Sequence, residues 1–315
     1  MATYRNILRA LAAAAGVFLC SQAPALAADT LVRGDEKCMA CHASVKADAV
    51  AGIAMTRHGD KADARTPSCS SCHGGSDKHM TSGGAEKPDR VFKGHGKASP
   101  EAVNGACLGC HESGARNHWA GSKHERENLA CNDCHTVHTA QDKVLAKITQ
   151  PDVCFACHKT ERAATHRISH HPVLEGKVAC SDCHNPHGSA GPKLLVERSV
   201  NDTCYTCHAE KRGPFLWEHA PVTDDCTNCH SPHGSTNAAL LKVRAPWLCQ
   251  QCHSGDHGKN LYSGANLPGG NATTINGLQG LANQSPPAQL NARACMNCHV
   301  LVHGSNHPAG AKFQR

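Results

Sequence analysis

Cys180-Ser-Asp-Cys183-His184 is one of ten stretches in this 315-residue chain in which two Cys separated by two residues are followed at once by His. Apart from Cys20, every one of the 21 Cys belongs to such a CxxCH motif. The motif Cys are Cys38, Cys41, Cys69, Cys72, Cys107, Cys110, Cys131, Cys134, Cys154, Cys157, Cys180, Cys183, Cys204, Cys207, Cys226, Cys229, Cys249, Cys252, Cys295 and Cys298. The His that close the motifs are His42, His73, His111, His135, His158, His184, His208, His230, His253 and His299.

CxxCH is the attachment signature of c-type haem. Two thiols on one short turn reach the two vinyl groups of a porphyrin, and the following His supplies an axial imidazole to the iron. A zinc site needs four ligands from paired clusters and has no use for a His after every pair. Disulfides would account for the Cys of an exported protein but not for the His. The sequence therefore predicts ten covalently attached haem c groups.

The supply of second axial ligands favours His at every iron. Fifteen His remain outside the motifs, whereas the only Met after residue 27 are Met39, Met55, Met80 and Met296. A haem iron with His on both faces has no open position for a substrate, so it passes electrons without activating small molecules. We therefore expect ten bis-His haems and an electron carrier that is not an enzyme.

An internal repeat guides the choice of second ligands. Residues 180–195 align with residues 226–241, and more loosely with residues 131–146, and each repeat carries two motifs. One candidate His lies 7 to 11 residues before each of motifs 2, 4, 6 and 8, and another lies soon after each. Motif 10 is followed by His303, and the nearest His before it is His257, across a long insertion. The ten candidates are His58, His79, His124, His138, His171, His187, His219, His233, His257 and His303. The other five, His95, His118, His166, His170 and His307, are interpreted as surface or hydrogen-bonding His, with His118 an alternative to His257 and His307 an alternative to His303.

Chain length limits which iron three of these ligands can reach. His138, His187 and His233 each follow a motif His by three residues, a span of about 10 Å at full extension. That span would have to wrap around the macrocycle to reach the other face of the same iron. We therefore expect these three His to bind a neighbouring haem.

Composition excludes an ordinary globular core. Residues 1–27 have a basic start, an apolar stretch and the small-residue end Ala25-Leu26-Ala27, which predict a cleaved signal peptide and export. Residues 28–315 hold 41 Leu, Ile, Val and Phe among 288, about 14%, which is too few for a side-chain core. The predicted fold is a multihaem cytochrome c, mostly irregular with short α-helices and little or no β, in which haems form the core of an elongated chain of dihaem repeats. Motifs 1–5 occupy 38–158, motifs 6–10 occupy 180–299, and 259–291 is expected to be a haem-free loop.

Charge gives no support to nucleic-acid binding. The formal net charge is +6, of which the signal segment carries +2. Ten haems would add about 20 propionates and make the mature protein negative.

Several stretches resemble one known family. They include Trp119-Ala-Gly-Ser-Lys-His124, Gln150-Pro-Asp-Val-Cys154, Asn185-Pro-His187-Gly188, Pro214-Phe-Leu-Trp217 and His303-Gly-Ser-Asn-His307. From about Cys38 to the C-terminus, the chain is similar to the MtrA/DmsE family of periplasmic decahaem c-type cytochromes. The resemblance implies a periplasmic protein inserted into an outer-membrane β-barrel complex.

The same resemblance implies redox partners on both sides. These are periplasmic or inner-membrane cytochromes, and an outer-surface multihaem cytochrome or terminal reductase. Such a chain would carry electrons between the periplasm and the cell exterior. A soluble periplasmic electron store or shuttle is the alternative, and a multihaem oxyanion reductase is a weaker one. The sequence leaves open the direction of flow and the terminal acceptor or donor, whether ferric or manganese oxide, ferrous iron or dimethyl sulfoxide.

Overall fold

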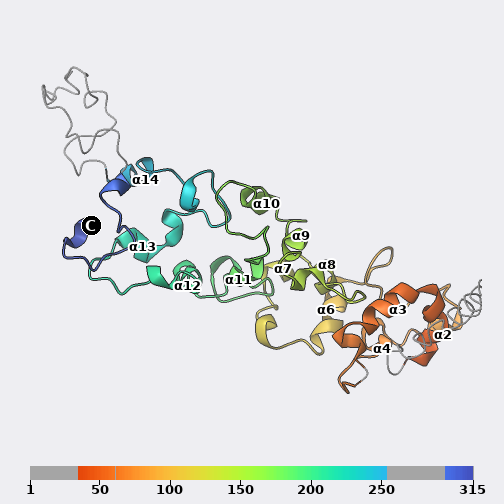
Figure 1. Cartoon of the computed structure of the whole chain (residues 1–315). Helices are drawn as coiled ribbons and strands as arrows, with labels where there is room; N and C mark the ends of the chain where they lie inside the picture. Colours follow the sequence, from red (N-terminus) through yellow and green to blue (C-terminus); the bar gives the residue numbers. More distant parts are fainter. Residues whose placement is uncertain (1–34, 61, 254–294, 315) are drawn as a thin grey trace, which may run out of the picture. The chain divides into compact units, whose positions relative to one another are not determined.

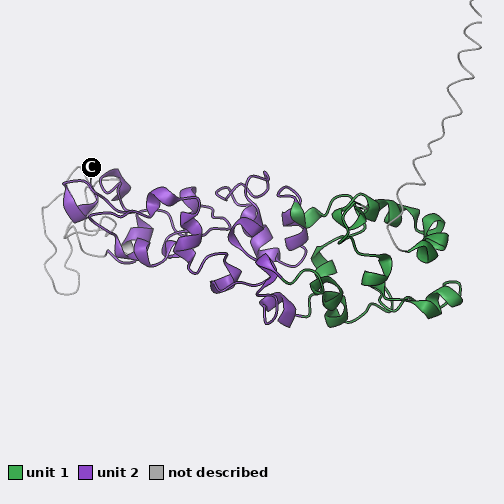
Figure 2. Ribbon diagram, turned by 90° about the horizontal axis from the view of Figure 1, so that it is seen from below, with its two compact units in different colours: residues 1–112, 128–145 green, residues 113–127, 146–315 purple. Residues whose placement is uncertain are grey.

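The computed structural model describes residues 35–60, 62–253 and 295–314. The expected signal peptide, the candidate ligand His257 and the expected loop 259–291 lie outside these ranges. The chain divides into two compact units, shown in different colours in Figure 2. Unit 1 comprises residues up to 112 together with 128–145, and unit 2 comprises 113–127 and the residues from 146 onward. Unit 1 thus holds motifs 1–4 and unit 2 holds motifs 5–10.

Both units consist of short helices joined by irregular segments (Figure 1). The helices of unit 1 are α2 (Glu36–Val45), α3 (Ala47–Ala54), η1 (Arg57–Gly59), α4 (Cys69–His73), α5 (Asp77–Thr81), α6 (Pro100–Leu108), α8 (Cys131–Cys134) and η3 (Lys143–Leu145). Those of unit 2 are η2 (Gly114–Arg116), α7 (Lys123–Arg126), α9 (Gln150–Cys154), α10 (Lys159–Thr165), α11 (Cys180–Cys183), η4 (Pro192–Leu194), α12 (Val200–Tyr205), η5 (Ala209–Lys211), α13 (Ala220–Asp224), η6 (Cys226–Asn228), η7 (Ala238–Leu240), α14 (Trp247–Gln250), η9 (Cys295–Asn297) and η10 (Gly310–Lys312).

Local capping explains why so many helices begin at or just before a motif. The Asp133 carboxylate accepts the Ala130 N–H at 2.8 Å in front of α8, and Asp182 accepts the Ala179 N–H at 2.9 Å in front of α11. Ser199 caps α12 by accepting the Asp202 N–H at 3.0 Å. A capped single turn holds both Cys of a motif on one side, which suits attachment to one porphyrin.

The described residues show little pairing of extended strands. They also bury few apolar side chains. In the described part of unit 2, β-structure is limited to isolated bridges such as Ser169↔Ser235 and His184↔Leu195. The buried apolar side chains among all described residues are Met39, Val103, Trp119, Ala130, Phe155 and Ala179. Among the described residues, the predicted short helices and near absence of β-structure are confirmed.

Candidate haem centres

The described residues include eight imidazole pairs, each of which joins a motif His to one of the candidate second ligands. Unit 1 contains His42–His79, His58–His111 and His73–His138. Unit 2 contains His124–His158, His171–His208, His184–His233, His219–His253 and His230–His303. The ring centroids lie 5.9 to 6.3 Å apart in every pair.

These separations fit two imidazoles bound to opposite sides of one metal ion. With metal–nitrogen bonds of about 2 Å, the centroids of two such rings lie roughly 6 Å apart. The interplanar angle varies from 14° to 86°, so the constant feature is the distance and not a stacking geometry. Free rotation about a metal–nitrogen bond gives that combination. The paired residues therefore fit a haem iron.

Backbone carbonyls contact the Nδ1 atom of many of these imidazoles and so orient the rings. Among the second-ligand candidates, Nδ1 lies 2.7 to 3.1 Å from a carbonyl oxygen in His79, His124, His138, His171 and His219. Among the motif His, the distance is 2.5 to 3.2 Å in His73, His184, His230 and His299. An Nδ1–H donated to a carbonyl leaves Nε2 with a free lone pair for a metal.

In unit 2 three of these carbonyls come from residues directly before another candidate ligand. His124, His171 and His219 bond to the carbonyls of Pro186, Pro232 and Val302. The next residues are His187, His233 and His303. Each bond therefore ties the orientation of one candidate ligand to the position of another.

The glycines after His187 and His233 permit another backbone segment to approach closely. Gly234 has φ +150°, and a Cβ there would collide with the carbonyl oxygen of Ala164. Gly188 has φ +109°, and its Cβ would collide with the carbonyl oxygen of His118. The His-Gly dipeptide of the repeat is thus a steric requirement at both positions.

The first Cys of consecutive motifs meet in pairs. Thiol–thiol hydrogen-bonding contacts join Cys38 to Cys69, Cys107 to Cys131, Cys154 to Cys180, Cys204 to Cys226 and Cys249 to Cys295. Burial and then the neighbouring Cys226 thiol raise the pKa of Cys204 to about 12. Motifs 1 and 2, 3 and 4, 5 and 6, 7 and 8, and 9 and 10 therefore form five pairs, each inside one unit.

A buried side chain before each of motifs 1, 3, 5 and 7 clamps the even motif that follows it. The Oδ1 atoms of Asn104 and Asn201 accept the N–H groups of Cys131 and Cys226, both at 2.8 Å. Gln150 accepts the Ser181 N–H at 2.9 Å, and Asp35 accepts the Cys69 N–H. The four clamp side chains belong to residues that are 6 to 8% exposed. Sequence reasoning missed them, although each lies three or four residues before a first Cys.

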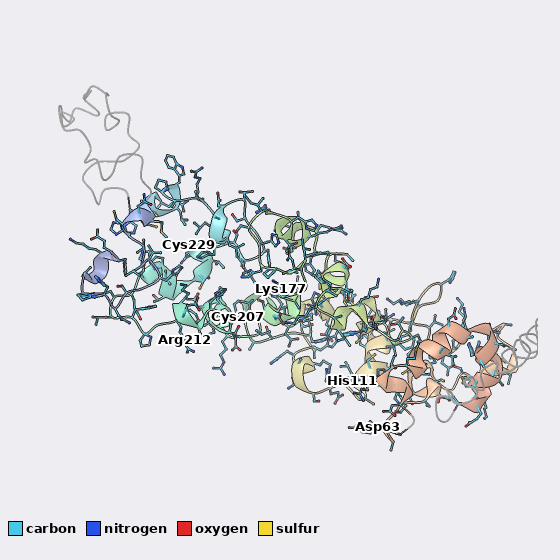
Figure 3. All side chains as sticks on the ribbon, in the orientation of Figure 1. Asp63, His111, Lys177, Cys207, Arg212 and Cys229 are labelled. Atoms are coloured by element: carbon cyan, nitrogen blue, oxygen red, sulfur yellow. The ribbon has the colours of Figure 1, made fainter. Side chains whose placement is uncertain are left out.

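In three motif pairs, the second Cys of the even-numbered motif lies near the first motif of the next pair. The thiol of Cys72 interacts with those of Cys107 and Cys110 in unit 1. In unit 2, Cys183 interacts with Cys207 and Cys229 with Cys252. Figure 3 labels the motif side chain His111 of unit 1 and the motif side chains Cys207 and Cys229 of unit 2. Motif pairs within a unit therefore follow one another in chain order.

The remaining His differ in their surroundings. His187 lies against the buried Trp119, with ring centroids 6.4 Å apart. His170, next to the paired His171, has Nδ1 2.5 Å from the Arg167 carbonyl and Nε2 3.4 Å from the Glu175 carboxylate. These contacts agree with a hydrogen-bonding role for His170.

Comparison with known proteins places this arrangement in a family. The multihaem cytochrome MtrA of Shewanella baltica is 44% identical over 288 residues, which cover 90% of this chain and 82% of the relative. The chain belongs to the MtrA family of multihaem cytochromes. Residues 170–213 and 219–258 match the doubled CXXCH motif, and residues 69–150 match the cytochrome c-type NrfB-like family. A high-molecular-weight cytochrome c of Nitratidesulfovibrio vulgaris is 26% identical over 143 residues, 45% of this chain and 24% of the relative.

Family membership confirms the resemblance seen in the sequence. As a member of the MtrA family, the chain is a c-type cytochrome with several covalently bound haems that carries electrons. Within the described residues, no helix is both long enough and apolar enough to cross a membrane.

Proposed function

We propose that this chain is a decahaem electron conduit between periplasmic carriers and the cell exterior. The observation that carries the proposal is the set of eight His–His pairs, each with one ring from a CxxCH motif. Bound haem c would supply reversible one-electron chemistry. The chain would attach each group through two thioethers, hold its iron between two imidazoles and set the spacing to the next motif.

The proposal includes all twenty motif Cys, the ten motif His and the ten candidate second ligands named above. His138 faces His73, and His233 faces His184, rather than the motif His three residues before them. This supports ligation across neighbouring motif pairs. His187 and His257 complete the set of ten: His187 rests on the sequence repeat, and His257 on its position as the nearest His before the last motif.

Membrane crossing requires a partner. We place the chain in the periplasm, inserted into an outer-membrane β-barrel, because exposed backbone polar groups and charged propionates do not face lipid. Electron exchange would occur with periplasmic or inner-membrane cytochromes at one end and an outer-surface cytochrome or terminal reductase at the other. The 44% identity to MtrA over most of both chains supports this placement.

Purified holoprotein and vesicles test the proposal. We expect ten haems per chain by pyridine haemochrome assay and mass spectrometry, and only low-spin EPR signals. Vesicles containing the chain and a co-expressed outer-membrane barrel should reduce an encapsulated dye from an external donor. Vesicles with the barrel alone should not.

Two other results would contradict the conduit and favour a different function. A chain that never co-purifies with a barrel would be a soluble shuttle. A stoichiometric high-spin haem that binds cyanide or nitric oxide would indicate a reductase.

A further inference from the structure

The Nδ1 atom of one motif His contacts a carboxylate at hydrogen-bonding distance, whereas the Nδ1 atoms of four others contact a backbone carbonyl. His73, His184, His230 and His299 each face a backbone carbonyl. His135, of motif 4, instead has Nδ1 2.7 Å from the Oδ2 atom of Asp142. An axial ligand bonded to a carboxylate is more basic than one bonded to an amide carbonyl.

The Asp142 carboxylate is held in place by its own donors. Its Oδ1 atom accepts the Thr136 N–H at 3.2 Å and the Thr136 hydroxyl at 3.3 Å. The Val144 N–H lies 3.4 Å from the same oxygen. The Asp142 side chain is 13% exposed, so solvent screens its charge only weakly. The second oxygen is left directed at His135.

We propose that Asp142 sets the reduction potential of the haem at Cys131–His135. The carboxylate makes this potential more negative than it would be without Asp142. The inference rests on the proposed haem attachment at this motif. Drawing the Nδ1–H proton toward Oδ2 gives the imidazole partial imidazolate character. Such a ligand donates more strongly and favours Fe(III) over Fe(II). The carboxylate changes only the potential at which this iron takes up or gives up one electron, so no co-reactant is needed.

Two other motif His provide an internal comparison. His158 and His208 also have carboxylates nearby, from Glu161 and Glu210, but each Nδ1–oxygen distance is 3.8 Å. These glutamate side chains are 39% and 61% exposed. They are too distant for a hydrogen bond and are well solvated, so they should leave the potentials of their haems nearly unchanged.

Spectroelectrochemical titration of the holoprotein tests the inference at constant pH. In Asp142→Asn, about one tenth of the α-band amplitude, the share of one haem in ten, should move to a more positive potential. The EPR signal of one low-spin haem should change with it. Asp142→Glu should restore most of the wild-type curve, and the matched control Glu161→Gln should overlay it. An Asp142→Asn curve that matches wild type, or one that shifts as a whole, would overturn the assignment.

Two further measurements distinguish failure of the proposed role of Asp142 from failure of the proposed function. If Asp142→Asn attaches fewer haems, Thr136→Val provides a second test. It removes one donor from Oδ1, strengthens the acceptor facing His135, and should move the same tenth to a more negative potential. An unchanged Thr136→Val curve would then reject the inference.

If wild-type protein lacks ten low-spin haems, the proposed function itself fails. If wild type has them and the curves do not move, only the role of Asp142 fails.

Discussion

At the scale of single residues, the orientation of an imidazole decides whether it can bind iron. His171 shows this well, because its Nδ1 faces the Pro232 carbonyl at 2.8 Å while its ring faces His208. The adjacent His170 bonds to Arg167 and Glu175 instead. The two neighbouring imidazoles therefore differ in what they face beyond their carbonyl acceptors: His171 faces a motif His and His170 faces a carboxylate.

Replacing His171 should expose one iron. His171→Ala is expected to convert the haem at Cys204–His208 to a high-spin species that binds cyanide, with about one tenth of the low-spin signal lost. The matched control His170→Ala should keep all low-spin signals. EPR of the purified holoproteins measures both, and an unchanged His171→Ala spectrum would contradict the pairing.

A single methyl group at the His-Gly dipeptide should be costly. Gly234→Ala adds a Cβ against the Ala164 carbonyl at a positive φ, and we expect a loss of about 1–3 kcal/mol in unfolding free energy. Gly75→Ala is the control, since a Cβ there meets nothing within 4 Å. Thermal denaturation monitored at the Soret band compares them, and equal stabilities would argue against a steric role for Gly234.

At the scale of elements, the α-helices of four to ten residues and the three-residue 3-10 helices are too short to be stable alone, so contacts between motifs must hold them. The clamp from α12 to η6 is an example. Besides accepting the Cys226 N–H, Asn201 donates to the carbonyls of Val222 and Thr223 at 2.9 and 3.1 Å. One buried amide thus connects motifs 7 and 8.

Removing this clamp should loosen that motif pair. Asn201→Ala leaves a buried N–H and two carbonyls without this partner, and we expect a destabilisation of about 1–3 kcal/mol. Asn228, which is exposed and bonds to Pro221 and Asp224, provides the control as Asn228→Ala. Guanidinium unfolding of both holoproteins distinguishes them, and identical midpoints would disprove the clamp.

At the scale of the whole molecule, the side-chain core formed by the described residues is very small. Among the described residues, Val103 is the one large side chain that is almost completely buried. Large apolar side chains such as Ile168 and Leu145 are 85% and 75% exposed. Cohesion of such a chain depends on groups attached to it.

The mature chain without haem should therefore be unfolded. Replacing all twenty motif Cys by Ser, or expressing the chain without haem maturation, is expected to give a random-coil circular dichroism spectrum with no cooperative melting. The holoprotein, measured in the same buffer, should melt cooperatively. A cooperatively folded apoprotein would show that side chains supply the core after all.

The predicted attachment sites, the fold class and the set of candidate ligands followed from the sequence alone. Each CxxCH motif is complete within five consecutive residues, and a low aliphatic content is a property of composition. The pairing of ligands required the tertiary structure, because His138 and His73 are 65 residues apart and only folding brings them together. Asp142, the carbonyl acceptors and the amide clamps were not predictable either, since an Asp, an Asn or a peptide carbonyl has no distinctive pattern. Local covalent chemistry thus determined what the chain binds, and long-range packing decided which imidazoles face each other and which polar group tunes them.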